Sequence, residues 1–200
     1  MSSEKRIYTL KARARRQAET RERIVAATSE LHREVGPART TIAEIARRAG
    51  VQRLTVYNNF PDERELFAEC SAHWLARNPL PDPSPAFALS DPDEMLGAVL
   101  RGLYGYYRKT EAMAFNIQRD RLVMPALDAV VTAGADAQLA VLANALTAGF
   151  KPSARNRVGV HAAVALALDF WTWRRLKQEG LSDDSSADLM LASVKAAAGS

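Results

Sequence analysis

The stretch of sequence that most constrains the fold runs from Thr40 to Phe60, and its signals predict two short helices joined by a tight turn. Thr40 or Thr41 offers a hydroxyl N-cap, and Glu44 follows Thr41 at the three-residue spacing of a capping box. Gly50 ends the first helix, because glycine enters the left-handed C-terminal conformation without steric penalty. The second helix is expected over residues 52–58. A unit of this kind can lay its second helix in the major groove of DNA.

This stretch and its flanks resemble the DNA-binding domain of the TetR family of one-component transcriptional regulators. The resemblance covers residues 21–67, and its specificity comes from a glycine turn, a Thr-x-Tyr pair and a terminal phenylalanine at matching spacing. The matching residues are Arg23-Ile24-Val25-Ala26-Ala27, Gly36, Thr40-Thr41-Ile42-Ala43-Glu44-Ile45-Ala46, Ala49-Gly50-Val51, Thr55-Val56-Tyr57, Phe60 and Leu66-Phe67. The resemblance implies an all-α homodimer, most often a repressor, that a small-molecule effector releases from a palindromic double-stranded DNA operator.

The predicted second helix carries the candidate base-reading residues. Arg53 can pair with guanine in the major groove, and the Thr55 methyl group can meet thymine. The resemblance implies that these two approach bases, whereas Thr40, Tyr57 and Asn58 hold phosphates. The whole candidate DNA-binding set is Thr40, Thr41, Gln52, Arg53, Thr55, Tyr57, Asn58 and Arg64.

Two positions depart from the family pattern. Gln52 stands where the family often has a serine cap, so the start of the second helix is expected to be less well capped. Glu63 stands where the family usually has a phosphate-binding lysine, and Arg64 beside it is the nearest replacement.

The charge distribution agrees with a DNA-binding amino-terminal part. Residues 1–58 hold 13 basic and 6 acidic residues, whereas the remainder holds 14 basic and 17 acidic ones. One basic end joined to a mildly acidic body suggests one module for a phosphate backbone and another for a different task. The first 18 residues are either a solvated flexible tail or an arm that contacts DNA.

The fold class expected is all-α, because helical periodicity recurs throughout and no strand pattern of period two is found. The predicted helices are 19–35, 41–49, 52–58, 62–77, 92–109, 111–121, 125–149, 154–178 and 183–197. His32 is expected on the polar side of the first of them. The predicted domains are a flexible arm (1–18), a DNA-binding domain (19–61), a connecting helix (62–77), a proline-rich connector (78–92) and an effector-binding and dimerisation body (93–200).

The body mixes aromatic and polar side chains as ligand pockets of helical bundles do. The candidate effector-binding residues are Tyr104, Tyr107, Phe115, Asn116, Asn144, His161, Asp169 and Trp171. Asp169 interrupts an apolar helix, and a structural bond to Arg155, Arg174 or a partner chain is favoured over a ligand role. If it faces a cavity, a cationic or hydrogen-bond-donating ligand beside Trp171 is the alternative.

The last two predicted helices are the candidates for self-association. Small residues there allow close approach of helices, either to a second subunit or within one chain. The candidate dimer residues are Ala162, Leu166, Phe170, Trp173, Leu189 and Val194. Dimerisation is favoured because two recognition helices about 34–36 Å apart read successive turns of DNA.

Other function classes find little support in the sequence. It holds no phosphate-binding glycine loop, nucleophile elbow or Cys/His cluster, so an enzyme, a metal site or a cofactor is not expected. The single cysteine, Cys70, is expected to be a packing residue. No secretory signal or membrane-spanning run is identified, so the cytoplasm is the expected compartment. The rival reading is a helix-turn-helix protein that binds DNA without a small-molecule effector.

Overall fold

The computed structural model describes residues 2–199, and it describes the side chains of these residues except for residues 2–10 and Ala12. All the regular elements of this described part are helical. The chain divides into two compact units. Unit 1 comprises Met1–Asn78 and Phe115–Val130, and unit 2 comprises Pro79–Ala114 and Val131–Ser200.

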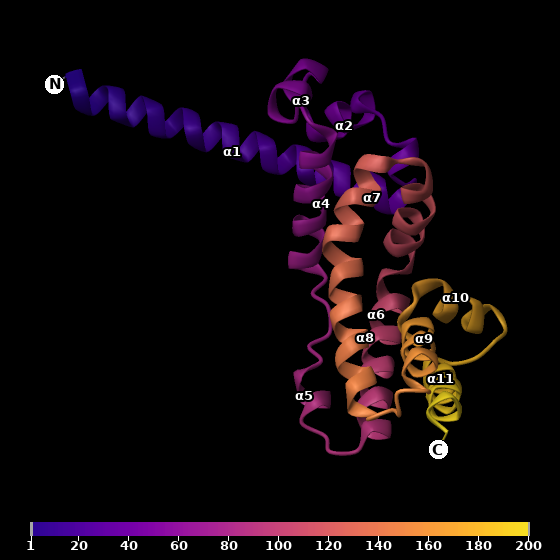
Figure 1. Cartoon of the computed structure of the whole chain (residues 1–200). Helices are drawn as coiled ribbons and strands as arrows, with labels where there is room; N and C mark the ends of the chain where they lie inside the picture. Colours follow the sequence, from indigo (N-terminus) through magenta and orange to yellow (C-terminus); the bar gives the residue numbers. More distant parts are fainter. Residues whose placement is uncertain (1, 200) are drawn as a thin grey trace. The chain divides into compact units, whose positions relative to one another are not determined.

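Unit 1 contains the predicted helix-turn-helix. Helix α1 covers Ser2–Glu34, and α2 (Ile42–Ala49), α3 (Arg53–Asn59) and α4 (Glu63–Arg77) follow it, as Figure 1 shows. Residues 2–18, for which a flexible arm was one expectation, form the first turns of α1. The short 3-10 turn Pro37–Arg39 joins α1 to α2.

Local capping explains where these helices begin and end. The Thr41 hydroxyl oxygen accepts a hydrogen bond from the Glu44 amide at 3.2 Å, which confirms the predicted cap of α2. Gly50 has φ 65°, the left-handed conformation expected of it. The Gln52 side chain makes no capping bond, also as predicted. The Asp62 carboxylate caps α4 by accepting from the Arg64 amide at 2.9 Å.

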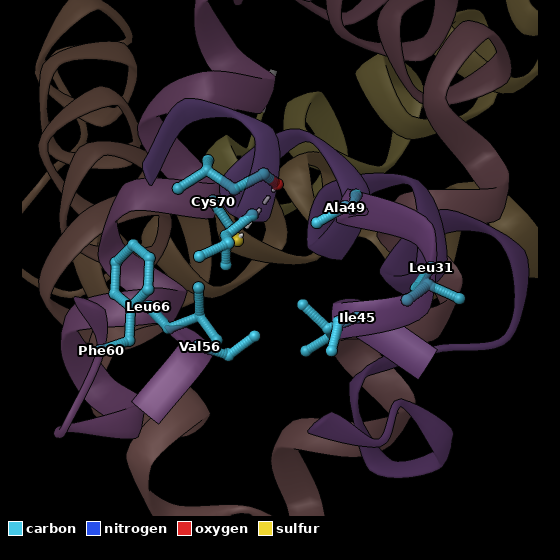
Figure 2. Packing of buried hydrophobic residues seen from close by; sticks show 11 residues of the cluster. Leu31, Ile45, Ala49, Val56, Phe60, Leu66 and Cys70 are labelled. Carbon is cyan, nitrogen blue, oxygen red and sulfur yellow. Dashed lines mark hydrogen bonds between the residues drawn. The ribbon is translucent and has the colours of Figure 1, made fainter. Parts of the chain in front are cut away.

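The apolar faces of these helices meet in one core, part of which Figure 2 shows. Tyr57 is 55% exposed, so most of its side chain lies outside this core. Cys70 is buried and its Sγ lies 3.7 Å from the Val25 carbonyl oxygen; burial raises the pKa of this thiol to about 12, so it packs as an inert residue. The core consists of Ile24, Val25, Ala27, Leu31, Ile45, Ala46, Ala49, Val56, Phe60, Leu66 and Cys70, with Ile42 and Val51 packed against it.

The remaining helices differ from the predicted ones in their breaks. Helix α6 is one helix over Pro92–Asp120, where two were predicted. Its first part lies in unit 2 and its last residues in unit 1. The predicted helix 125–149 is α7 (Pro125–Val131), a π-helical turn (Thr132–Asp136) and α8 (Ala137–Gly149). The connector contains a single helical turn, α5 (Ser84–Phe87).

The predicted helix 154–178 is wrong in the middle, because Asp169 ends one helix and caps the next. Helix α9 covers Arg157–Leu168 and α10 covers Phe170–Gln178. Asp169 has an extended backbone, and its carboxylate accepts a hydrogen bond from the Thr172 amide at 2.7 Å. This local cap explains how a carboxylate is accommodated there. The last helix, α11, covers Asp183–Ala198 and is capped by Ser182.

The segment Pro125–Gly149 is long and apolar enough, by length and composition alone, to cross a membrane. The sequence analysis identified no such run. One helix of this kind is weak evidence for a membrane protein, because apolar helices that pack against protein pass the same test.

Candidate nucleic-acid interface

Helix α3 presents most of its polar side chains to solvent. Gln52, Arg53, Tyr57 and Asn58 are exposed, and Thr55 is half-buried. Val56 on the opposite side is fully buried, so the core fixes which face of α3 is free. Within the described part of the chain the Arg53 guanidinium makes no ion pair, which leaves its donors available for a base edge or a phosphate.

Sequence reasoning did not assign a role to one exposed residue on this helix. Leu54 is 65% exposed although it is a large apolar side chain. The signal was its position beside Arg53, two residues before the buried Val56 and therefore on a different face of α3. An apolar side chain here can contact a thymine methyl group in the major groove.

The start of α2 is the second polar surface of unit 1. Thr41 is exposed at the N-cap, and the Thr40 hydroxyl donates to the Gly36 carbonyl oxygen at 2.8 Å. Amide groups at a helix N-terminus and the helix dipole both favour a phosphate. Arg64, in the first turn of α4, is also exposed. Thr41 and Arg64 therefore lie at helix starts, where the backbone can assist a phosphate contact, whereas Tyr57 and Asn58 lie in the last turn of α3.

Several other basic residues of unit 1 are engaged in internal ion pairs. Arg47 pairs with Glu44 at 2.5 Å, and Arg48 pairs with Glu34 at 2.8 Å. The hydrogen bond to Glu44 raises the pKa of the Arg47 guanidinium. These partnered arginines are poorer candidates for DNA contacts than Arg53, because their charge is already partly neutralised.

Arg21 of α1 holds the far end of α3 in place. Its Nε donates to the Glu69 carboxylate at 2.9 Å, and its Nη1 donates to the Asn59 carbonyl oxygen. Its guanidinium carbon lies 4.0 Å from the centre of the Phe60 ring. The hydrogen bond to Glu69 is the largest cause of a raised pKa for this guanidinium. Arg21 thus joins α1, the end of α3 and α4 through one side chain.

The sequence comparisons agree with this geometry. Residues 24–70 match the model of a family described as bacterial regulatory proteins, tetR family. The amino-terminal domain of this chain is a tetR-family domain. An uncharacterized HTH-type transcriptional regulator of Mycobacterium tuberculosis is 48% identical over 59 residues, which are 30% of this chain and 31% of that protein. The match thus spans less than a third of the length of that curated relative.

Solved structures extend the tetR-family likeness to the fold of most of the chain. A TetR-like transcriptional regulator from Rhodococcus sp. RHA1 has a TM-score of 0.61 at 19% identity, over 90% of this chain and 97% of that one. NalD, the secondary repressor of the MexAB-OprM multidrug efflux pump in Pseudomonas aeruginosa, has a TM-score of 0.55 at 20% identity, over 90% and 96%. At these identities the likeness is one of fold.

The structure separates the candidate effector residues. Tyr104 and Tyr107 are buried, and their hydroxyls donate to the carbonyl oxygens of Ala167 and Leu168, both at 2.8 Å. Burial raises the pKa of both phenols. The two tyrosines therefore satisfy the end of α9, and neither lines the hollow described below.

Four further effector candidates do not share a site with the two tyrosines. Phe115 and Asn116 belong to unit 1, and Asn116 is buried against the backbone of α1. Asp169 is the cap of α10, so its role is structural, although its partner is a backbone amide and not the arginines considered. Trp171 meets the Phe170 ring edge to face, with 5.4 Å between ring centres.

Two candidates, Asn144 and His161, do meet at one hollow in unit 2. The hollow has a volume of about 420 Å³. Its other lining residues are Thr147 from α8 and Arg157 and Val158 from α9. No acidic residue is part of this lining, and the described part of the chain shows no group of His, Cys, Asp and Glu able to hold a metal ion.

The candidate dimer residues fall into two groups. Phe170, Trp173 and Val194 are at most 4% exposed, so they pack inside unit 2 and are wrong as surface anchors. Ala162, Leu166 and Leu189 are exposed. Helices α9 and α11 pack side by side, so these exposed residues lie on neighbouring helices.

Proposed function

We propose that this chain is a sequence-specific, DNA-binding transcriptional regulator of the tetR type that acts in the cytoplasm. The observation that carries the proposal is the exposed face of α3, with Arg53 and Tyr57 both open to solvent, in a domain that matches the family model. Arg53 and Thr55 read base edges, and Thr40, Tyr57 and Asn58 contact phosphates. Base contacts set sequence preference, whereas phosphate contacts set position and overall affinity.

The first experiment separates these two kinds of contact. A genome-wide selection identifies the operator, and fluorescence anisotropy then measures affinity for the operator and for a scrambled duplex. Arg53→Ala is expected to weaken operator binding by about 1–3 kcal/mol and to leave the scrambled duplex less affected. Tyr57→Phe is expected to weaken both duplexes alike, because a phosphate contact carries no sequence information. Equal losses on both duplexes for both variants would refute this division of roles.

The regulatory part of the proposal is a repressor that an effector releases. In this mechanism the effector binds unit 2, shifts α4 and lowers the affinity for the operator by favouring the state that does not fit both half-sites. The description of NalD as a repressor, together with the shared fold, supports the sign of regulation. A constitutive DNA-binding protein remains the competing proposal.

The hollow between α8 and α9 suggests which effectors to test first. Its volume lies within the range of small-molecule sites. Arg157, His161 and Asn144 offer cationic or amide groups, and no carboxylate opposes them. A ligand with a carboxylate or another acidic group fits this lining best.

A thermal-shift screen of acidic metabolites and drugs, repeated with operator DNA, tests the effector proposal. An acidic effector is expected to raise the melting temperature of the free protein and to weaken operator binding. Arg157→Ala should abolish both effects, and Arg155→Ala, an exposed neighbour outside the lining, should retain them. A screen in which no compound changes stability or DNA affinity would favour the constitutive protein.

A further inference from the structure

The last residues of α6 form a cluster of polar side chains within unit 1, which we call the α6 clamp. Its members are Asn116, Arg119 and Asp120. Asn116 is 7% exposed and Asp120 is 3% exposed. Buried polar groups destabilise a protein unless they are hydrogen-bonded, so their partners indicate what the cluster holds.

The α6 clamp first satisfies the end of α1. The Asn116 Nδ2 donates to the carbonyl oxygens of His32 and Arg33, both at 3.0 Å. The Arg119 Nη2 donates to the Val35 carbonyl oxygen at 3.2 Å. The last carbonyls of a helix have no partner within the helix, so α6 supplies the capping contacts that α1 lacks.

The clamp then holds the turn between α1 and α2. The Asp120 Oδ2 accepts from the Ala38 amide at 2.9 Å, and its Oδ1 accepts from the Arg119 Nε at 2.6 Å. Gly36 has φ +94°, and a Cβ added there would lie 2.3 Å from the Arg119 Nη2 and 2.4 Å from the Asp120 Oδ2. The backbone of the turn therefore lies directly against the Arg119–Asp120 pair.

The turn at residues 36–40 also fixes the start of α2. The Thr40 hydroxyl donates to the Gly36 carbonyl oxygen at 2.8 Å, and the Thr40 amide donates to the Pro37 carbonyl oxygen at 3.0 Å. Thr41, the next residue, is the N-cap of α2. A short series of hydrogen bonds thus connects Asp120 with the surface that the proposed function assigns to phosphate.

We propose that Asp120 is a positioning residue for DNA binding, which acts through the turn at residues 36–40 on the phosphate-binding start of α2. This inference rests on the proposed function. Asp120 itself touches no DNA; it fixes where Thr40 and the first amides of α2 lie. Because phosphate contacts carry no sequence information, loss of the clamp weakens binding to every duplex by a similar factor. The salt dependence of binding should change little, because Thr40 and the amides of α2 carry no net charge and release no counterions.

The test uses the full chain and two substitutions at one position. Asp120→Ala removes the acceptor of the Ala38 amide, whereas Asp120→Asn retains an oxygen there. Asp128→Ala is the matched control: Asp128 pairs with Arg121 at 2.7 Å in the same unit, and this ion pair does not involve the turn. Anisotropy titrations measure the affinity for operator and scrambled duplexes. A stoichiometric titration gives the active fraction of each protein, and the affinities are corrected for it.

Asp120→Ala is expected to bind both duplexes about tenfold more weakly. Asp120→Asn removes the same charge but keeps an acceptor, so it should recover most of the affinity, and Asp128→Ala should match the wild type. A residue that only stabilises the fold would change the active fraction but not the affinity of that fraction. If circular dichroism shows Asp120→Ala to be unfolded, Asp120→Ser carries the test at the same position, because its shorter side chain loses the bond to the Ala38 amide; a similar loss on both duplexes is again expected.

Two results would overturn the inference. One is a folded Asp120→Ala chain with the affinity of the wild type. The other is a loss confined to the operator, which would assign the clamp to base reading. Failure of the wild type to bind any duplex is a separate outcome, because it would remove the proposed function itself.

Discussion

His32 is 4% exposed and its ring lies 5.7 Å from that of Phe67, although sequence reasoning placed it on the polar side of its helix. Burial lowers the pKa of this imidazole to about 4, and the nearby Asp120 opposes the shift only in part. The unfolded chain takes up a proton here near pH 6.5, whereas the folded chain does not. Stability is therefore complete above about pH 6.5 and is lost as the pH falls towards about 4.

The substitution His32→Phe tests this acid sensitivity, because it keeps a ring against Phe67 and removes the titration. Between about pH 7.5 and about pH 5, the wild type is expected to lose about 2 kcal/mol more unfolding free energy than the variant. The pKa of Asp120 is lowered overall, since bonds from Arg119 and Ala38 outweigh its burial, so its own contribution is lost only at lower pH. Urea unfolding at both pH values measures the difference; parallel losses in the two proteins would contradict the assignment.

Gly36 and Gly105 form a matched pair of positions at which alanine has opposite effects. Gly36→Ala forces a Cβ against Arg119 and Asp120 in a left-handed backbone, so it is expected to destabilise the chain by roughly 2 kcal/mol or more. Gly105 lies within α6 with nothing within 4 Å of an added Cβ, so Gly105→Ala is expected to stabilise by about 0.5–1 kcal/mol. Thermal and urea unfolding measure the change in unfolding free energy for both variants. Changes of the same sign would contradict the difference in space around the two glycines.

At the scale of elements, the helix-turn-helix was predictable because its signals are local. The Thr41 cap, the Gly50 turn and the apolar positions that meet in the core all lie within one short stretch. Each signal acts on the backbone within about four residues of itself, so one sequence suffices to place it. The exposed face of α3 was predictable for the same reason, because the buried Val56 fixes the opposite face.

Two features of the helices were not predicted. The burial of His32 depends on residues distant in sequence, and the helix break at Asp169 depends on a capping carboxylate that was taken for part of a continuous helix. His32 is buried where the end of α6 meets α1, and no local pattern announces the Asn116 contacts more than 80 residues away. The break at Asp169 did have a signal, a carboxylate three residues before the amide it caps. Within α6 a break was expected near Lys109, where no glycine or proline stands to end a helix.

At the scale of the whole molecule, the exposed apolar surface of unit 2 bears on self-association. Val158, Ala162 and Leu166 follow one another at four-residue spacing along α9, and all three are exposed. Val158 is 79% exposed and Leu166 is 57% exposed, and Leu189 on the adjacent α11 is 46% exposed. Side chains of this kind on two packed helices are typical of an interface, because burial against a second copy removes their apolar area from water.

If α9 and α11 form a contact between two copies of the chain, Leu166→Glu is expected to prevent it, because the substitution places a charge in the centre of this stripe. Val141→Glu is the matched control, since Val141 is 70% exposed but lies on α8 and not on α9 or α11. Sedimentation velocity should show a dimer for the wild type and for Val141→Glu and a monomer for Leu166→Glu. Without a partner, the Leu166→Glu chain holds only one half-site, so its affinity for a palindromic operator should fall at least tenfold while half-site binding is retained. A dimeric Leu166→Glu chain would place the interface elsewhere. A monomeric wild type that binds an isolated half-site as tightly as the whole operator would rule out this assembly.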